Sequence, residues 1–192
     1  MKTVAVIEGF SGGPMHTRTF RKAVRRAGFS VVKNYREADI IVAHSAGIYA
    51  IPPDVRARIL ILIGPTYWPG RKLIRRVLAY TKSGRLFYVK NYGWRFYIWK
   101  KVLELYYFFR RHRYLWLGIR NNNKLDRLYK LADDQDRQII LVRNRDDPFC
   151  DPAIQELFKD RPNVRFVELP GVHEDYTTNP KPYIKLMEEA GE

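Results

Sequence analysis

The chain has 192 residues, enough for one domain with a core of its own. No apolar run reaches the length of about 18 residues that a membrane-spanning helix needs, and the single cysteine, Cys150, excludes an internal disulfide. One cysteine is typical of a reducing compartment, so we predict a cytoplasmic protein, with peripheral attachment to a membrane left open.

The formal net charge of +15 comes from one segment of the chain. Between Pro65 and Leu131 there are 17 Lys/Arg but only two acidic residues, and the remainder holds 18 of each sign. The same segment contains all four tryptophans. We therefore predict a neutral scaffold, residues 1–64 and 136–192, that carries a basic aromatic insertion at 65–135.

Alternating apolar runs and amphipathic stretches predict an α/β fold. Strands are expected at 3–8, 29–33, 39–43, 58–63, 138–142 and 164–169, and helices at 17–27, 151–158 and 182–190. This order indicates a mostly parallel sheet with helices on both faces. Only residues 34–38 separate the second and third strands, so either a helix has shrunk to about one turn or the second strand lies elsewhere.

The segment Ala43-His44-Ser45-Ala46-Gly47 follows an apolar strand and leads into residues that can begin a helix. A serine at such a sharp turn projects its hydroxyl above the end of a sheet, and small neighbours let the backbone approach closely. The pattern makes Ser45 a candidate nucleophile. His44 is interpreted as a neighbour of the turn without a chemical role.

Two further candidates follow later strands. Asp147 lies just after the strand at 138–142, and His173 just after the strand at 164–169. Carboxyl ends of parallel strands share one edge of a sheet, so we expect Ser45, Asp147 and His173 to meet there. A serine needs a base to take its proton, and that histidine needs a carboxylate to hold it in the right tautomer.

These motifs resemble those of the α/β-hydrolase superfamily, and more narrowly the small YdeN-like, retinoblastoma-binding serine hydrolases. The resemblance lies in the loop 9–13, His44-Ser45-Ala46-Gly47, Asp146-Asp147-Pro148-Phe149 and Gly171-Val172-His173, and it leaves the insertion uncovered. It implies a three-layer sandwich of about six strands with a mainly helical cap. It also implies Ser45 as nucleophile, His173 as general base and Asp147, rather than Asp146, as the orienting acid.

The same resemblance implies that the backbone N–H groups of Phe10 and Ala46 form the oxyanion hole. Glu8 stands where the superfamily usually has His or Pro, and a carboxylate there opposes catalysis unless it is paired or turned away. No Cys/His ligand pattern and no phosphate-binding loop are present, so we expect neither a metal nor a cofactor. Cys150 is expected to be a buried, inert thiol.

The insertion contains two amphipathic stretches. In residues 71–80, Leu73, Ile74, Val77 and Leu78 form one face, and the basic residues Arg71, Lys72, Arg75 and Arg76 the other; residues 99–109 form a second helix. Residues 86–99 are compatible with a hairpin or with more helix. The simplest interpretation is a cap with solvated charges; the alternatives are an interface with anionic lipid and, less favoured for want of a recognised motif, nucleic-acid binding.

The sequence thus predicts a serine hydrolase that cleaves small-molecule or lipid carboxylic esters through an acyl-enzyme on Ser45. The alternative is a catalytically weak or inactive hydrolase scaffold. In that case the cap would bind an anionic membrane, nucleic acid or a protein partner.

Overall fold

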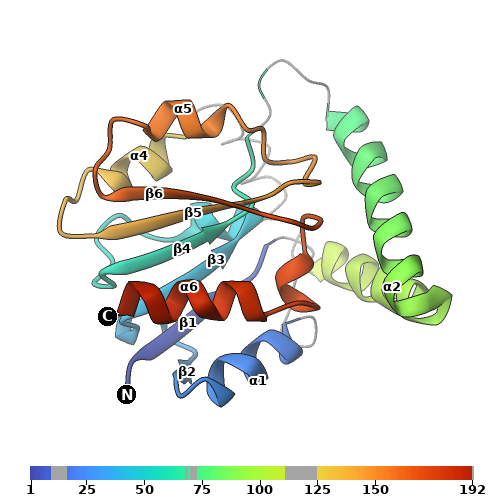
Figure 1. Ribbon diagram of the computed structural model, residues 1–192, viewed down its shortest axis with the longest axis horizontal. Helices are drawn as coiled ribbons and strands as arrows, with labels where there is room; N and C mark the ends of the chain where they lie inside the picture. The colour runs from blue at the N-terminus through green and yellow to red at the C-terminus, as the bar shows by residue number, and fades with distance from the viewer. Residues whose placement is uncertain (10–16, 68, 70–72, 111–124, 192) are drawn as a thin grey trace.

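Six parallel strands form one sheet in the order β2-β1-β3-β4-β5-β6 (Figure 1). The computed structural model describes residues 1–9, 17–67, 69, 73–110 and 125–191, so Phe10 lies outside the described residues. The strands are β1 Thr3–Ile7, β2 Ser30–Val32, β3 Ile40–His44, β4 Ile59–Ile63, β5 Gln138–Asn144 and β6 Val164–Leu169. All six expected strands are therefore present, with ends that differ by at most two residues.

The strand order explains the short connection between the second and third strands. β1 pairs with both β2 and β3, so these two strands are not neighbours in the sheet. The 3-10 helix η1, Tyr35–Glu37, fills the link, and the Asn34 side chain accepts a hydrogen bond from the Arg36 N–H. The link thus combines a helix reduced to one turn with a strand that lies elsewhere.

Helices cover both faces of the sheet (Figure 1). Within the described chain they are α1 Arg18–Arg26, α2 Leu73–Arg110, α4 Asp126–Ala132, α5 Ile154–Phe158 and α6 Lys181–Gly191, with 3-10 helices η2 Ser45–Ala50 and η3 Asp175–Thr177. α4, α5 and η2 pack on one face of the sheet, and α1 and α6 pack on the other. α5 begins three residues later than expected, because Asp151 forms a turn in which its carboxylate accepts from the Ala153 N–H.

The sequence analysis did not predict α4, which lies inside the segment 65–135. Its side chains Leu128, Leu131 and Ala132 are buried in the same cluster as residues of β3 and β4. The division into a core of 1–64 and 136–192 and an insertion of 65–135 stays a prediction, and α4 belongs by its packing with the core.

The longest part of the insertion that the structure describes is α2, which stands beside the sheet (Figure 1). Gly93 has φ +80° and ψ 167°, so it breaks α2 into a first half, residues 73–92, and a second half, residues 94–110. Residues 86–99 are therefore helical apart from this break.

The faces predicted for the first half are wrong at three residues. Arg76 is buried, while Val77 and Leu78 are exposed. The Arg76 guanidinium donates to the Pro148 carbonyl and to the Asp151 carboxylate, and these polar partners explain why Arg76 points inward.

Candidate active site

The candidate residues lie along one edge of the sheet because the strands are parallel and in register. His44 at the end of β3 is level with Ile63 of β4, and Ile63 is level with Val142 of β5. Ser45 and Gly64 immediately follow these strand ends. Asp147 comes three residues after β5 ends, and His173 four residues after β6 ends.

Ser45 has a left-handed backbone conformation, with φ +53°. Such a conformation is strained for any residue other than glycine, and strain of this kind is typical of functional turns. A Cβ atom at Gly9 would lie 2.9 Å from the Ser45 Cβ, and one at Gly47 would lie 2.4 Å from the Glu8 carbonyl oxygen. Both glycines therefore allow the close backbone approach that the turn requires.

The turn continues into η2, a short 3-10 helix rather than an α-helix. Ala46, the residue after the serine, is buried in the first turn of η2. The first N–H groups of a helix have no acceptor within it, so the Ala46 N–H is suited to an oxyanion. Phe10, the other expected donor, lies outside the described residues.

The structure brings Asp147 and His173 together. The distance between Asp147 Oδ2 and His173 Nδ1 is 2.7 Å, and Oδ1 of the same carboxylate accepts from the Phe149 N–H at 2.8 Å. Burial opposes ionisation of Asp147, but His173 and the Phe149 N–H lower the pKa of its carboxyl below the usual value. Asp146 is exposed, so the geometry favours Asp147 as the partner of His173.

This contact fixes the tautomer of His173. An ionised carboxylate only accepts hydrogen bonds, so Nδ1 carries the proton and Nε2 has a free lone pair. Ser45 and His173 are both buried, and the described structure contains no hydrogen bond between them. In unliganded active sites this contact is often long and shortens only when substrate binds.

His44 supports the backbone of the histidine loop. Its Nε2 lies 2.9 Å from the His173 carbonyl oxygen, and the centroids of the two rings are 4.5 Å apart. The carbonyl accepts, so His44 carries its proton on Nε2. His44 is thus placed to hold His173 in position, a structural role that the sequence did not indicate.

A second support comes from β5. The Asn144 amide donates to the Val172 carbonyl at 2.7 Å and accepts from the Tyr183 hydroxyl at 2.7 Å. All three side chains are buried. The residue before His173 is therefore tied to the sheet and to α6.

Gly64 fits under the Asp147–His173 pair. Its φ is +56°, and a Cβ there would lie 2.7 Å from Asp147 Oδ2 and 3.1 Å from His173 Nδ1. Glycine is therefore needed at this position for backbone conformation and for space.

The Glu8 carboxylate is paired. It accepts from Arg21 at 2.6 Å and from the Thr17 hydroxyl at 2.9 Å. Burial alone would raise the pKa of Glu8, but Arg21 and Thr17 lower it, so the negative charge is matched by a cation. This satisfies the condition under which a carboxylate at this position is compatible with catalysis.

Aromatic rings enclose His173. The centroid of the Phe149 ring is 5.1 Å from that of His173, and the Tyr80 ring of α2 approaches edge-on at 6.1 Å. The two aromatic rings also contact each other. The first half of α2 thus forms part of the wall around the candidate base.

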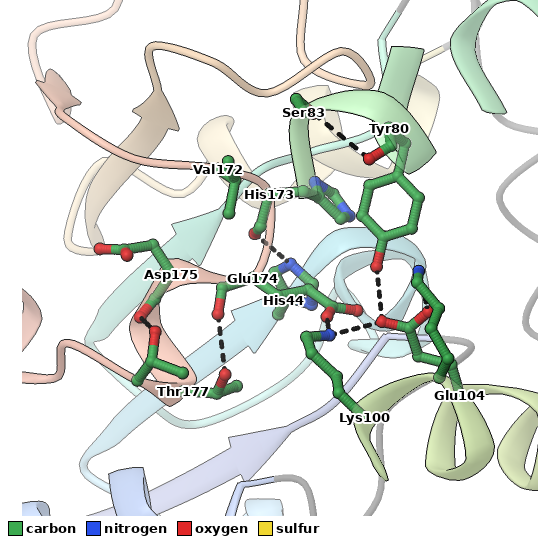
Figure 2. A network of polar contacts seen from close by, with 12 residues as sticks. His44, Tyr80, Ser83, Lys100, Glu104, Val172, His173, Glu174, Asp175 and Thr177 are labelled. Atoms are coloured by element: carbon green, nitrogen blue, oxygen red, sulfur yellow. Dashed lines mark hydrogen bonds and ion pairs between the residues drawn. The ribbon is translucent and has the colours of Figure 1, made fainter. Parts of the chain in front are cut away.

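The second half of α2 reaches the same loop through buried charges (Figure 2). The Lys100 ammonium lies between two carboxylates: Glu174, which directly follows His173, and Glu104, at 2.5 Å. Glu104 also accepts from the Tyr80 hydroxyl at 2.9 Å and from Lys101. Burial lowers the pKa of Lys100 to about 8, while the Glu104 carboxylate opposes this shift.

Tyr80, Lys100, Glu104 and Glu174 were not predicted from the sequence as parts of the site. One local signal was available: Lys100 and Glu104 are four residues apart on a helix, a spacing at which opposite charges pair. Nothing in the local pattern connects Lys100 with Glu174, since the contact joins parts of the chain 74 residues apart.

Cys150 is buried, and burial raises the pKa of its thiol well above the usual value, which keeps the thiolate scarce. Within the described ranges, no three or more His, Cys, Asp or Glu side chains cluster as metal ligands do.

No protein-family model matches the chain, and a comparison with curated proteins found no match. Solved structures do resemble it. A hydrolase from Oleispira antarctica is 14% identical with a TM-score of 0.65, and the match covers 98% of this chain and 90% of the other. An enol-lactonase from Burkholderia xenovorans is 12% identical with a TM-score of 0.64 and the same coverage.

An esterase from Pyrococcus furiosus is 14% identical with a TM-score of 0.58, and the match covers 98% of this chain and 80% of the other. At such low identity these likenesses establish the fold alone. The chain has the α/β-hydrolase fold, a parallel six-stranded sheet with helices on both faces.

Proposed function

We propose that this protein is a serine hydrolase that cleaves carboxylic esters through an acyl-enzyme on Ser45. The observation that carries the proposal is the buried contact between Asp147 and His173 at the edge of the sheet where β3 ends in the strained turn of Ser45. The α/β-hydrolase fold supports it, because that fold places all three residues at one edge of the sheet.

In the first half of the reaction, His173 Nε2 takes the proton of the Ser45 hydroxyl as the oxygen attacks the ester carbonyl carbon. The Asp147 carboxylate stabilises the imidazolium that forms, without taking the proton itself. The negative oxygen of the tetrahedral intermediate accepts from the Ala46 N–H, and a second donor is expected from Phe10. A donor of this kind typically contributes a factor of ~10²–10³ in rate.

The intermediate then collapses. The bond to the leaving oxygen breaks, and His173 gives its proton to the departing alcohol. In the second half, water attacks the acyl-enzyme while His173 takes its proton. Release of the carboxylic acid returns the proton to the Ser45 oxygen, so atoms and charge balance over the cycle.

The surroundings suggest the kind of ester. Phe149 and Tyr80 present apolar ring surface beside His173, which favours a small-molecule or lipid ester with an apolar acyl part. The similar structures include an esterase and an enol-lactonase. Their names support a substrate with a carbonyl group for this chain.

Labelling with a fluorophosphonate probe tests the assignment. We expect wild-type protein to be labelled and Ser45→Ala to remain unlabelled. Ser83→Ala is a matched control, because Ser83 lies on α2 and donates to the Tyr80 carbonyl. Equal labelling of wild type and Ser45→Ala would contradict the proposal, and so would a wild type that takes up no label.

A further inference from the structure

The second half of α2 is an amphipathic helix with its faces reversed. Its polar side chains Lys100 and Glu104 point inward, with relative exposures of 2% and 12%. Exposed apolar side chains recur three or four residues apart on the opposite side: Trp94, Ile98, Val102 and Leu105. Residues at that spacing share one helix face, so a continuous apolar stripe faces solvent.

The first half of α2 adds positive charge. Exposed basic side chains alternate with exposed leucines at helical spacing, in the series Arg75, Leu78, Lys82, Leu86 and Lys90. Arg85 is exposed as well. Glu104 is the only acidic residue of α2 and is enclosed by Lys100, Lys101 and Tyr80. We call the exposed side of both halves the outer face of α2. It consists of this series and Arg85 in the first half and of the apolar stripe in the second half.

Exposed large apolar side chains concentrate on this helix. Of the 13 that occur among the described residues, 11 belong to α2, and the others are Met1 and Leu157. Apolar patches of this kind mark surfaces that bind a partner or a membrane. No helix in the described part of the chain is long and apolar enough to cross a bilayer.

The chemistry of the outer face distinguishes between possible partners. A second copy of this chain would bring two basic faces together, and the like charges would repel. Nucleic acid would match the charge, but Ile98, Val102 and Leu105 cannot stack on bases as aromatic rings do. The interface of an anionic bilayer accepts all three classes of side chain: aliphatic, aromatic and basic.

We propose that the outer face of α2 docks the protein onto the surface of an anionic lipid bilayer, where the helix lies in the interface without crossing it. The inner face of the same helix contacts the loop of His173 through Tyr80 and Lys100. Docking therefore brings the candidate active site within roughly one helix diameter, about 10 Å, of the lipid.

Binding to vesicles tests this proposal independently of catalysis, so we use the full chain carrying Ser45→Ala. We expect co-sedimentation with vesicles of equimolar phosphatidylcholine and phosphatidylserine, and weak binding to phosphatidylcholine alone. A blue shift of tryptophan emission should accompany binding, because Trp94 belongs to the outer face and Trp99 is also exposed on the second half of α2. Added salt should weaken the interaction.

Paired variants locate the binding surface. Arg85→Gln with Lys90→Gln should lower binding to the anionic vesicles about 25-fold, since each basic residue near such a surface contributes about fivefold. Lys159→Gln with Lys185→Gln is the control, because it removes the same charge from exposed residues outside α2. This pair should change binding less than twofold, which is about the uncertainty expected for sites distant from the binding surface.

The apolar stripe has its own pair. Ile98→Gln with Leu105→Gln should reduce binding about 100-fold, because less apolar surface is removed from water when the protein binds the vesicle. Leu157→Gln, an exposed leucine outside α2, should leave binding unchanged. All four α2 substitutions are at exposed positions, and an unchanged melting temperature will verify that the variants fold.

Several outcomes would overturn the proposal. They are absence of vesicle binding, equal binding to neutral and anionic vesicles, and equal loss in the α2 variants and their controls. Binding to a single-stranded oligonucleotide without binding to vesicles would identify a nucleic-acid surface instead. A blue shift that depends on protein concentration in the absence of lipid would identify self-association.

Discussion

Lys100 of α2 forms a buried ion pair with Glu174, the residue that follows His173. The ammonium group also lies 2.5 Å from Glu104, so one cation stands between two enclosed carboxylates. Through this contact the position of α2 and the position of the candidate base are linked.

Lys100→Met removes the cation from between the two carboxylates. We expect a loss of about 3–5 kcal/mol in the free energy of unfolding, the usual cost of breaking a buried ion pair. Urea denaturation measures it. Ester hydrolysis, measured where the variant is folded, should fall too, because Glu174 and with it His173 will shift.

Two comparisons isolate the cause. Lys100→Met combined with Glu174→Gln should recover part of the lost stability, because one buried charge is gone. Lys101→Met removes a cation that is 31% exposed and should cost less than about 1 kcal/mol. A similar loss in the Lys100 and Lys101 variants would argue against a special role for the buried pair.

Gly64→Ala should damage the site through a single methyl group. The new Cβ would lie 2.7 Å from Asp147 Oδ2, so the Asp147–His173 pair must move. In enzymes, a displacement of about 1 Å in a catalytic group lowers the rate by about 100-fold. The measurement is kcat for a chromogenic ester at saturating substrate.

Gly28→Ala is the matched control for that variant. Gly28 has φ +87°, but a Cβ there would meet no atom within 4 Å. Both substitutions impose the strain of a left-handed alanine, about 1–2 kcal/mol, and only one crowds the site. Equal activity in the two variants would show that Gly64 matters for backbone conformation alone.

Asp147→Asn tests the orienting acid. The variant keeps the size of the side chain but lets His173 adopt the wrong tautomer, which costs about 10⁴ in kcat in enzymes with this arrangement. Asp146→Asn, at the exposed neighbouring position, should retain nearly full activity. The reverse result would assign the role to Asp146.

The two variants Ser45→Gly and Ser45→Ala should both be inactive, yet differ in stability. At φ +53° alanine keeps the left-handed strain and glycine relieves it, so Ser45→Gly should be more stable by about 1 kcal/mol. Thermal denaturation of both proteins measures the difference. Equal stability would mean that the turn holds little strain.

How much the sequence predicts depends on where the information lies. The strands were located because β3 and β4 are short, mostly apolar runs, which are typical of strands buried on both faces of a sheet. The approach of Asp147 to His173 followed from the same logic, since parallel strands end at one edge.

The orientation of α2 was not predictable in this way. Hydrophobic patterning assumes that apolar faces turn inward, but Arg76 and Lys100 turn inward because distant backbone and carboxylate groups receive them. Those partners belong to segments 72 and 74 residues away in the chain, and no local pattern records them. The contact of Tyr80 with His173 was not predicted for the same reason, since it joins distant segments of the chain.

Asp175 should make stability depend on pH. It is buried two residues after His173, and burial raises the pKa of its carboxyl to about 6, although Asn179 donates to it. A pKa that is raised on folding favours the protonated form in the native state. The resulting stabilisation is complete below the unfolded value of 3.8 and is lost as pH rises through about 6.

Asp175→Asn removes this titration while keeping the shape of the side chain. We expect the stability of the variant relative to wild type to increase from pH 4 to pH 7 by about 1–2 kcal/mol, less than the full shift of the pKa implies because solvent screens part of the charge. Urea denaturation at both pH values measures the gain, and Asp160→Asn, an exposed aspartate, controls for removal of one negative charge. A difference between variant and wild type that is the same at both pH values would mean that Asp175 is ionised in the native state without cost.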